Sequence, residues 1–104
     1  MYLEISRADA RLAEPEVFTA FHVVRPAGLT PDEFTEALAA HGIGEPDGDD
    51  VLVRVAAVRA LAAGRVGPDW EDGFAGMLAY AGRKGWLSAD GSAVRAHVEG
   101  SAGS

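Results

Sequence analysis

The most regular pattern of apolar and polar positions lies over residues 31–41, where apolar side chains recur at the three- and four-residue spacing of a helix. Thr30 and Glu33 have the spacing of a capping box, and a proline occupies the first helical position between them. Gly42 suits the left-handed conformation in which many helices end. These local signals agree with one another and predict a helix over 31–41.

Two further helices are predicted downstream. A nearly continuous apolar run predicts one over residues 50–63, which an aspartate would cap and Gly64 would end. Positions 51–55 are rich in β-branched residues and favour a strand equally, but the alanine-rich continuation favours the helix. The other helix is predicted over residues 68–84 by a stripe of large apolar side chains at helical spacing: Trp70, Phe74, Met77, Leu78 and Ala81.

The N-terminal region carries weaker patterns. Residues 1–5 predict a short strand, with alternate apolar side chains on one face, and residues 6–14 predict a helical turn or two. Residues 17–24 are apolar on both faces and rich in strand-forming residues, which favours a buried strand. A helix that begins at Pro15 fits the same side chains, so both interpretations stay open for this segment.

The C-terminal region predicts a hairpin, because residues 86–88 and 92–98 are short extended runs on either side of an Asp-Gly turn. The whole pattern predicts one helix-rich α+β domain over residues 1–99. It would have three main helices, a short N-terminal strand region and a C-terminal β-hairpin. Residues 100–104 are small and polar and predict a flexible tail.

Charge adds a constraint on the binding partner. The 104 residues include 16 Asp and Glu against 9 Lys and Arg, a formal net charge of −7 at pH 7. This excess argues against a general phosphate-binding surface, and we expect no nucleic-acid partner. Residues 1–50 hold eleven of the acidic and only three of the basic side chains. Such an asymmetry indicates either a molecule that docks onto a basic partner or head to tail onto its own copy, or solvated faces distributed by chance.

Two absences narrow the chemistry and the compartment. The chain has no cysteine, which excludes disulfides, thiolate metal sites and cysteine nucleophiles. No apolar run approaches the roughly 20 residues of a bilayer span, and the N-terminus lacks the regions of a signal peptide. We therefore expect a cytoplasmic protein without a membrane partner. Its abundant arginine, alanine and glycine are typical of a GC-rich bacterial genome.

Three histidines, His22, His41 and His97, are the main candidates for chemistry, and none has the spacing of a metal motif. We expect no metal site and no cofactor. His41 is interpreted as a polar residue at a helix C-terminus. His22 lies in an apolar run and has two interpretations. It is either a core histidine bonded to a backbone carbonyl, or a general acid or base in a pocket beside a carboxylate such as Glu4 or Glu36.

A second candidate site lies on the last predicted strand. Arg95 and His97 share one strand face, which indicates either a solvated ladder of basic and acidic side chains or an anion-binding face. The acidic segment 45–50 lacks the glycine and glutamate positions of a calcium-binding EF-hand loop and is interpreted as a linker with a helix cap. No phosphate loop, dinucleotide fingerprint or nucleophile elbow is present.

One part of the pattern bears on DNA. A helix that ends at Lys84, followed by a turn and the extended run around Arg95, is similar to the last helix and wing of a winged-helix domain. The proposed recognition helix begins with Asp69, Glu71 and Asp72, and these carboxylates would repel phosphates. DNA binding is therefore the least favoured of the functional hypotheses.

Small size and the absence of a catalytic motif favour a non-catalytic interaction or accessory protein, which acts through a protein partner or through self-association. Trp70 and Trp86 flank the third predicted helix and can anchor an interface. Gly73 and Gly76 allow another backbone to approach that helix closely. The alternative is a small enzyme or ligand-binding domain that uses His22 as general acid or base, so the sequence leaves enzymatic activity undecided.

Overall fold

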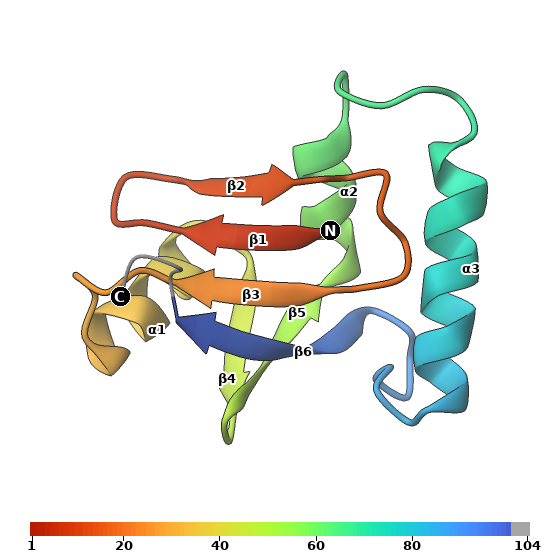
Figure 1. The fold of residues 1–104 in the computed structure, drawn as a ribbon. Coiled ribbons are helices and arrows are strands. Elements are labelled where there is room, and N and C mark those ends of the chain that lie inside the picture. The colour runs from red at the N-terminus through yellow and green to blue at the C-terminus, as the bar shows by residue number, and fades with distance from the viewer. Residues whose placement is uncertain (101–104) are drawn as a thin grey trace.

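The computed structural model describes residues 1–100 and consists, over that range, of one six-stranded mixed sheet and three helices (Figure 1). The strand order is β2-β1-β3-β6-β5-β4. Strands β1, β3 and β6 run parallel at the centre, and β2, β5 and β4 are antiparallel to their neighbours. The strands are β1 (Tyr2–Ile5), β2 (Ala10–Ala13), β3 (His22–Arg25), β4 (Gly44–Asp47), β5 (Asp50–Arg54) and β6 (Ala93–Gly100).

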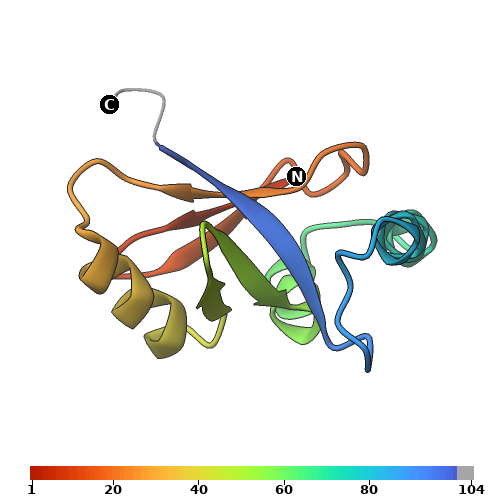
Figure 2. The ribbon, with the colours of Figure 1, turned by 90° about the horizontal axis from the view of Figure 1, so that it is seen from below.

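The helices lie unequally around this sheet. Helices α1 (Pro31–Ala40) and α2 (Val55–Ala62) both cover the same face (Figure 2). Helix α3 (Trp70–Arg83) stands beside the sheet, next to the ends at which β3 and β6 begin (Figure 1). Within residues 1–100, no helix covers the other face of the sheet. None of these helices is both long and apolar enough to cross a membrane.

Period-two alternation explains which face is covered, because successive strand side chains point to opposite sides of a sheet. Every strand except β4 contributes apolar, buried side chains to the covered face: Leu3, Ile5, Leu12, Val23, Val51, Val53, Val94 and Ala96. They pack with Leu38 of α1 and Val58 of α2 in one core. The alternate positions point to the open face and include histidine, arginine and carboxylate side chains, so this face is polar without a covering helix.

The prediction of a helix-rich domain is wrong, since 32% of the described residues are helical and 30% are extended. The largest error concerns residues 50–63. Their first part is strand β5, which lies between β4 and β6, and only Val55–Ala62 forms helix α2. The β-branched side chains of Val51 and Val53 are fully buried against the core. Strand β5 pairs with β4 along one edge and with β6 along the other. This pairing, together with the burial of the valines, outweighs the helical preference of the alanines that follow.

The predicted C-terminal hairpin forms only over a short length. The run 86–88 pairs antiparallel with the start of β6 through a bridge between Leu87 and Val94, where the Arg95 N–H donates to the Trp86 carbonyl at 2.7 Å and the Ser88 N–H donates to the Ala93 carbonyl at 2.8 Å. Unlike a hairpin arm, strand β6 then enters the middle of the sheet, parallel to β3 and antiparallel to β5. Gly100 is the last residue of β6 and pairs with Arg25, so this residue belongs to the sheet and not to the predicted tail. Residues 101–104 lie outside the described part of the chain.

Two more predictions near the sheet edges are corrected. Residues 6–14 contain a turn and strand β2 instead of a helix. The acidic segment 45–50 is a hairpin of β4 and β5, in which Asp47 pairs with Asp50 across a two-residue loop. Gly48 opens that loop with a φ of 63°, a left-handed conformation that glycine adopts without steric cost. Between Pro15 and Phe21 the chain is irregular, and the strand begins only at His22.

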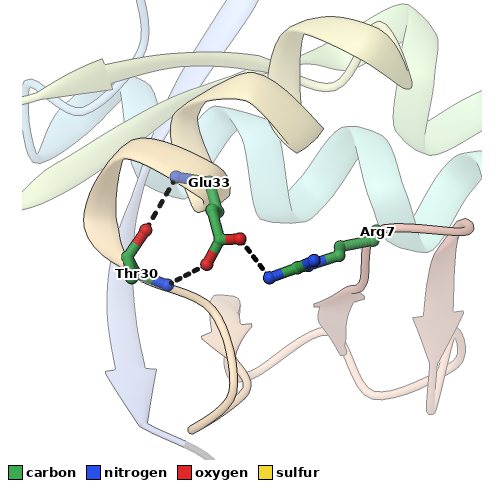
Figure 3. A network of polar contacts seen from close by, with 3 residues as sticks. All are labelled: Arg7, Thr30 and Glu33. Carbon is green, nitrogen blue, oxygen red and sulfur yellow. Dashed lines mark hydrogen bonds and ion pairs between the residues drawn. The ribbon is translucent and has the colours of Figure 1, made fainter.

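Helix α1 confirms the capping prediction (Figure 3). The Thr30 hydroxyl accepts a hydrogen bond from the Glu33 backbone N–H at 3.2 Å, and the Glu33 carboxylate accepts one from the Thr30 N–H at 3.0 Å. Arg7, from the β1–β2 turn, pairs with the same carboxylate. The bond from the Thr30 backbone and the guanidinium of Arg7 hold the pKa of Glu33 below its ordinary value. The first turn of α1 is thereby fixed to the sheet.

Helix α3 is confirmed as an element, and side chains attach it to the segment before β3. The Trp70 indole N–H donates to the Pro15 carbonyl at 2.6 Å, and the Trp70 ring stacks on Phe74 at 4.7 Å between centroids. The helix ends at a left-handed Gly85 with a φ of 78°, after which the Trp86 N–H donates to the Ala81 carbonyl at 2.9 Å. After this ending the Trp86 ring lies edge to face against Tyr80 of the same helix, with the ring centroids 6.0 Å apart.

Candidate functional site

A single row of side chains crosses the open face of the sheet. Strand register places Ala13, Tyr2, His22, His97, Asp50 and Asp47 opposite one another on β2, β1, β3, β6, β5 and β4 in turn. Both histidine candidates therefore lie on adjacent parallel strands and face the same side. Neither the proximity of His22 to His97 nor that of His97 to Asp50 follows from the sequence, because it depends on where β6 enters the sheet.

His22 is half-buried on this face, between an aromatic ring and a carboxylate. Its ring stacks on Tyr2 with the centroids 5.0 Å apart, and its Nε2 lies 3.0 Å from the Glu99 carboxylate. The carboxylate partner is thus Glu99 on β6. Glu4 lies on β1 and pairs with Arg11, while Glu36 lies on α1, which covers the other face of the sheet.

Arg95 is engaged by two carboxylates of the β4–β5 hairpin. Its guanidinium lies 2.8 Å from Asp47 and 3.9 Å from Asp50. These pairs bridge β6 to the sheet edge and compensate much of the charge of Arg95 locally. Of the two interpretations of this strand face, the ladder of basic and acidic side chains describes it better. Arg95, His97 and Glu99 follow one another along β6, and Arg95 faces the carboxylates of the neighbouring hairpin.

Two adjoining hollows lie where this polar row meets α3. The first has a volume of about 240 Å³ and is lined by Phe21, Asp50, Trp86, Arg95 and His97. The second, of about 80 Å³, shares three of these residues and continues between α3 and the segment before β3. We call the two hollows together the aromatic groove. The side chains that define it are Phe18, Phe21, Asp50, Met77, Tyr80, Trp86, Val94, Arg95 and His97.

Two large aromatic side chains of the groove are exposed to solvent. Tyr80 is 48% exposed and Trp86 is 43% exposed, and their rings meet edge to face at 6.0 Å. Val17 is the only other large hydrophobic side chain within residues 1–100 with comparable exposure. The ends of Arg83 and Lys84 lie 5.8 and 5.6 Å from the Tyr80 ring centroid. The groove thus combines exposed aromatic area with two cations at its rim.

The remaining binding residues suggested by the sequence are distributed differently. Trp70 is only 6% exposed and belongs to the core. A Cβ on Gly73 would lie 2.3 Å from the Phe18 ring, so a side chain of the same molecule already fills that approach. Gly76 faces open space, with no atom within 4 Å of the corresponding position. Of these candidates, only Trp86, Arg95 and His97 are brought together in the groove.

Sequence reasoning missed Tyr80, Phe21, Asp50 and Glu99. Tyr80 carried a signal, because it is a large aromatic residue that falls outside the apolar stripe of its own helix. A large aromatic side chain that points away from the core indicates a binding surface. The other three join the site through strand register, which has no local signature.

Two larger and shallower hollows, each of about 470 Å³, lie elsewhere on the molecule. One is lined largely by alanines of α2, and its His41 ring is bonded to the Ser6 carbonyl at 2.9 Å. The other lies between the start of α1 and the β4–β5 loop. Neither contains a large exposed aromatic side chain. Residues 1–100 also contain no cluster of three or more histidine or carboxylate side chains that fits a metal ion.

No protein-family model, curated protein or solved structure matches this chain.

Proposed function

We propose that this protein is a non-catalytic interaction module, and that it binds a protein partner at the aromatic groove. The observation that carries the proposal is the pair of touching, exposed rings of Tyr80 and Trp86. Tryptophan and tyrosine are the side chains that most often dominate binding energy when an interface buries them. Exposing them to water is unfavourable in the free protein, and a partner that covers them removes this apolar area from solvent.

The polar surroundings support binding more than catalysis. Arg95 and Asp50, the charged side chains that line the groove, already pair with each other. His22, the candidate acid or base, is bonded to Glu99 and lies outside the groove lining. The sheet fixes the positions of Arg95, Asp50 and His22 beside the groove. Such an arrangement suits a preformed interface with a polar rim.

Site-specific photocrosslinking tests this proposal. Tyr80 is replaced by the photoreactive residue benzoylphenylalanine, which keeps an aromatic ring at the groove, and the full chain is expressed in its native cells. The matched control carries the same residue in place of Glu36, an exposed position on α1. We expect a discrete protein adduct from position 80 that is absent from position 36 and is lost when Trp86→Ala is added. Equal adducts from both positions, or none from position 80, would contradict the proposal.

A second candidate function rests on one specific pair of residues. His97 and Asp50 are register partners on β6 and β5, and both line the hollow of about 240 Å³. An imidazole beside a carboxylate in a hollow is an arrangement used for acid–base chemistry on small ligands. Native mass spectrometry of the purified protein distinguishes this candidate. This second function requires that a small molecule remains bound to the purified native protein. The molecule should be retained by the Tyr80→Ala variant and lost from the His97→Gln variant.

A further inference from the structure

We infer that the aromatic groove takes an acidic segment of the partner protein, with one apolar or aromatic side chain in the groove and flanking carboxylates against Arg83 and Lys84. This inference rests on the proposed function, and it specifies the chemistry of the partner.

The rim of the groove differs in charge from the molecule as a whole. The chain has a net charge of −7, yet the end of α3 presents Arg83 and Lys84 in sequence beside Tyr80. Within residues 1–100 neither cation has an ion-pair partner. The same is true of Arg25, Arg54 and Arg65, but of these cations only Arg83 and Lys84 lie over an exposed aromatic ring. Their position at a helix C-terminus is favourable for the helix, and it also leaves both charges available to an incoming carboxylate.

The size of the groove favours a side chain over a cofactor. Sites for small organic ligands typically have volumes of roughly 300–1,000 Å³. The two hollows of the groove, at about 240 and about 80 Å³, are each smaller, and together they reach only the lower end of this range. The smaller hollow lies between Phe18, Met77 and Tyr80, and it is the more apolar of the two in its lining residues. A single apolar side chain from a peptide fits this description, with the peptide backbone outside the groove.

Single-stranded nucleic acid is the strongest competing ligand, because aromatic rings and cations are also the components of its binding sites. The groove carries too little positive charge for it. Arg95 is engaged by Asp47 and Asp50, and Asp50 itself lines the groove, where it would lie close to phosphates. A nucleic-acid strand places a negative charge on every nucleotide along the groove, including the end lined by Asp50. The carboxylates of a short acidic peptide need to meet only the two cations beside Tyr80.

Fluorescence anisotropy with the full-length chain tests the inference. The probe is a labelled synthetic peptide with one central phenylalanine between aspartates and glutamates. One comparison peptide has serine in place of the phenylalanine, and another has lysines in place of the acidic residues. A labelled oligothymidylate serves as the nucleic-acid probe. We expect binding of the first peptide alone, with an affinity that weakens as the salt concentration rises.

Three variants locate the binding on the protein. Trp86→Ala should weaken binding about tenfold or more, because it removes an aromatic anchor. The double variant Arg83→Gln with Lys84→Gln should weaken it about threefold or more and reduce its salt dependence. The matched control is Arg7→Gln with Arg11→Gln, which removes the same charge at the β1–β2 end of the sheet and should leave the affinity unchanged. Circular dichroism checks that each variant is folded, and the serine peptide tests the anchor without altering the protein.

Each other result overturns the inference in a distinct way. If the lysine peptide binds as tightly as the acidic peptide, the rim charges do not select the partner. If oligothymidylate binds more tightly than the acidic peptide, the groove is a nucleic-acid site. A dimer mass in solution that Trp86→Ala converts to monomer assigns the groove to a second copy of the chain. If position 80 crosslinks a partner but no acidic peptide binds, the interaction function stands and only its chemistry is wrong. If position 80 gives no adduct, the proposed function itself fails.

Discussion

The ring of Phe18 occupies the space that a side chain on Gly73 would need, with its nearest atom 2.3 Å from the position of a Cβ. This relationship joins α3 to the irregular segment before β3, which also contributes the Pro15 carbonyl bonded to Trp70. Helix α3 is therefore held by a few side chains along one stripe. Its opposite side and its C-terminal end remain available, and they contain Gly76, Tyr80 and the cations of the groove rim.

The two glycines should respond oppositely to the same substitution. Gly76→Ala places a methyl group in open space and should stabilise the protein by about 1 kcal/mol, because alanine is the better helix former. Gly73→Ala gains the same propensity but displaces the rigid Phe18 ring, and we expect a net loss of about 1–2 kcal/mol. Urea unfolding of both variants measures the difference. A Gly73→Ala protein as stable as Gly76→Ala would show that Phe18 moves aside freely.

Phe74 is fully buried, stacked on Trp70 and covered by the guanidinium of Arg59 at 5.3 Å from the ring centroid. Phe74→Ala should lower the free energy of unfolding by about 3–5 kcal/mol through lost burial and the cavity left behind. Tyr80→Ala, on the exposed side of the same helix, is the control and should change it by less than about 1 kcal/mol. Comparable losses in the two variants would contradict the assignment of Tyr80 to a binding surface.

The capping box of α1 gives a third prediction. Thr30→Ala removes the hydroxyl that accepts from the Glu33 N–H and should lower the free energy of unfolding by about 1 kcal/mol. Thr30→Ser retains the hydroxyl and should be close to the native chain. The same denaturant series measures both, and an unchanged stability in Thr30→Ala would mean that water replaces the cap without loss.

Asp90 provides a pH-dependent prediction. Its carboxylate accepts bonds from the Ser92 hydroxyl and backbone N–H and from the Ser88 hydroxyl, which lower its pKa to about 2. Because the folded-state pKa is depressed, its stabilising contribution is complete above the unfolded value near 3.8 and disappears as the pH falls towards 2. Asp90→Ala should therefore be less stable than the native chain at pH 7, and part of that difference should be lost by pH 2.

Thermal unfolding of the two proteins between pH 7 and pH 2 measures this effect. The decisive observation is the convergence of their midpoints within the acid range. A difference that stays constant down to pH 2 would show that Asp90 stabilises the turn without its charge. Asp32→Ala is the control, as an exposed acidic residue in the first turn of α1, away from the turn that contains Asp90.

Local signals in the sequence were sufficient for α1 and for most of α3. The hydrogen bonds of Thr30, Glu33 and Gly42 join residues close along the chain, so residue type and spacing specify them directly. The stripe from Trp70 to Ala81 is likewise a property of one helix. The inward positions of β1, Leu3 and Ile5, were also readable, since alternation along a single strand marks its buried face.

Tertiary structure decided the rest, because strand pairing depends on residues far apart in the chain. The segment from Val51 to Arg54 is compatible with either helix or strand, and pairing with β4 and β6 selects the strand. The insertion of β6 between β3 and β5 brings His97 beside both His22 and Asp50 and carries Glu99 to His22. The candidate site is thus a consequence of register across six strands, whereas the exposed Tyr80 and Trp86 follow from one helix and its ending.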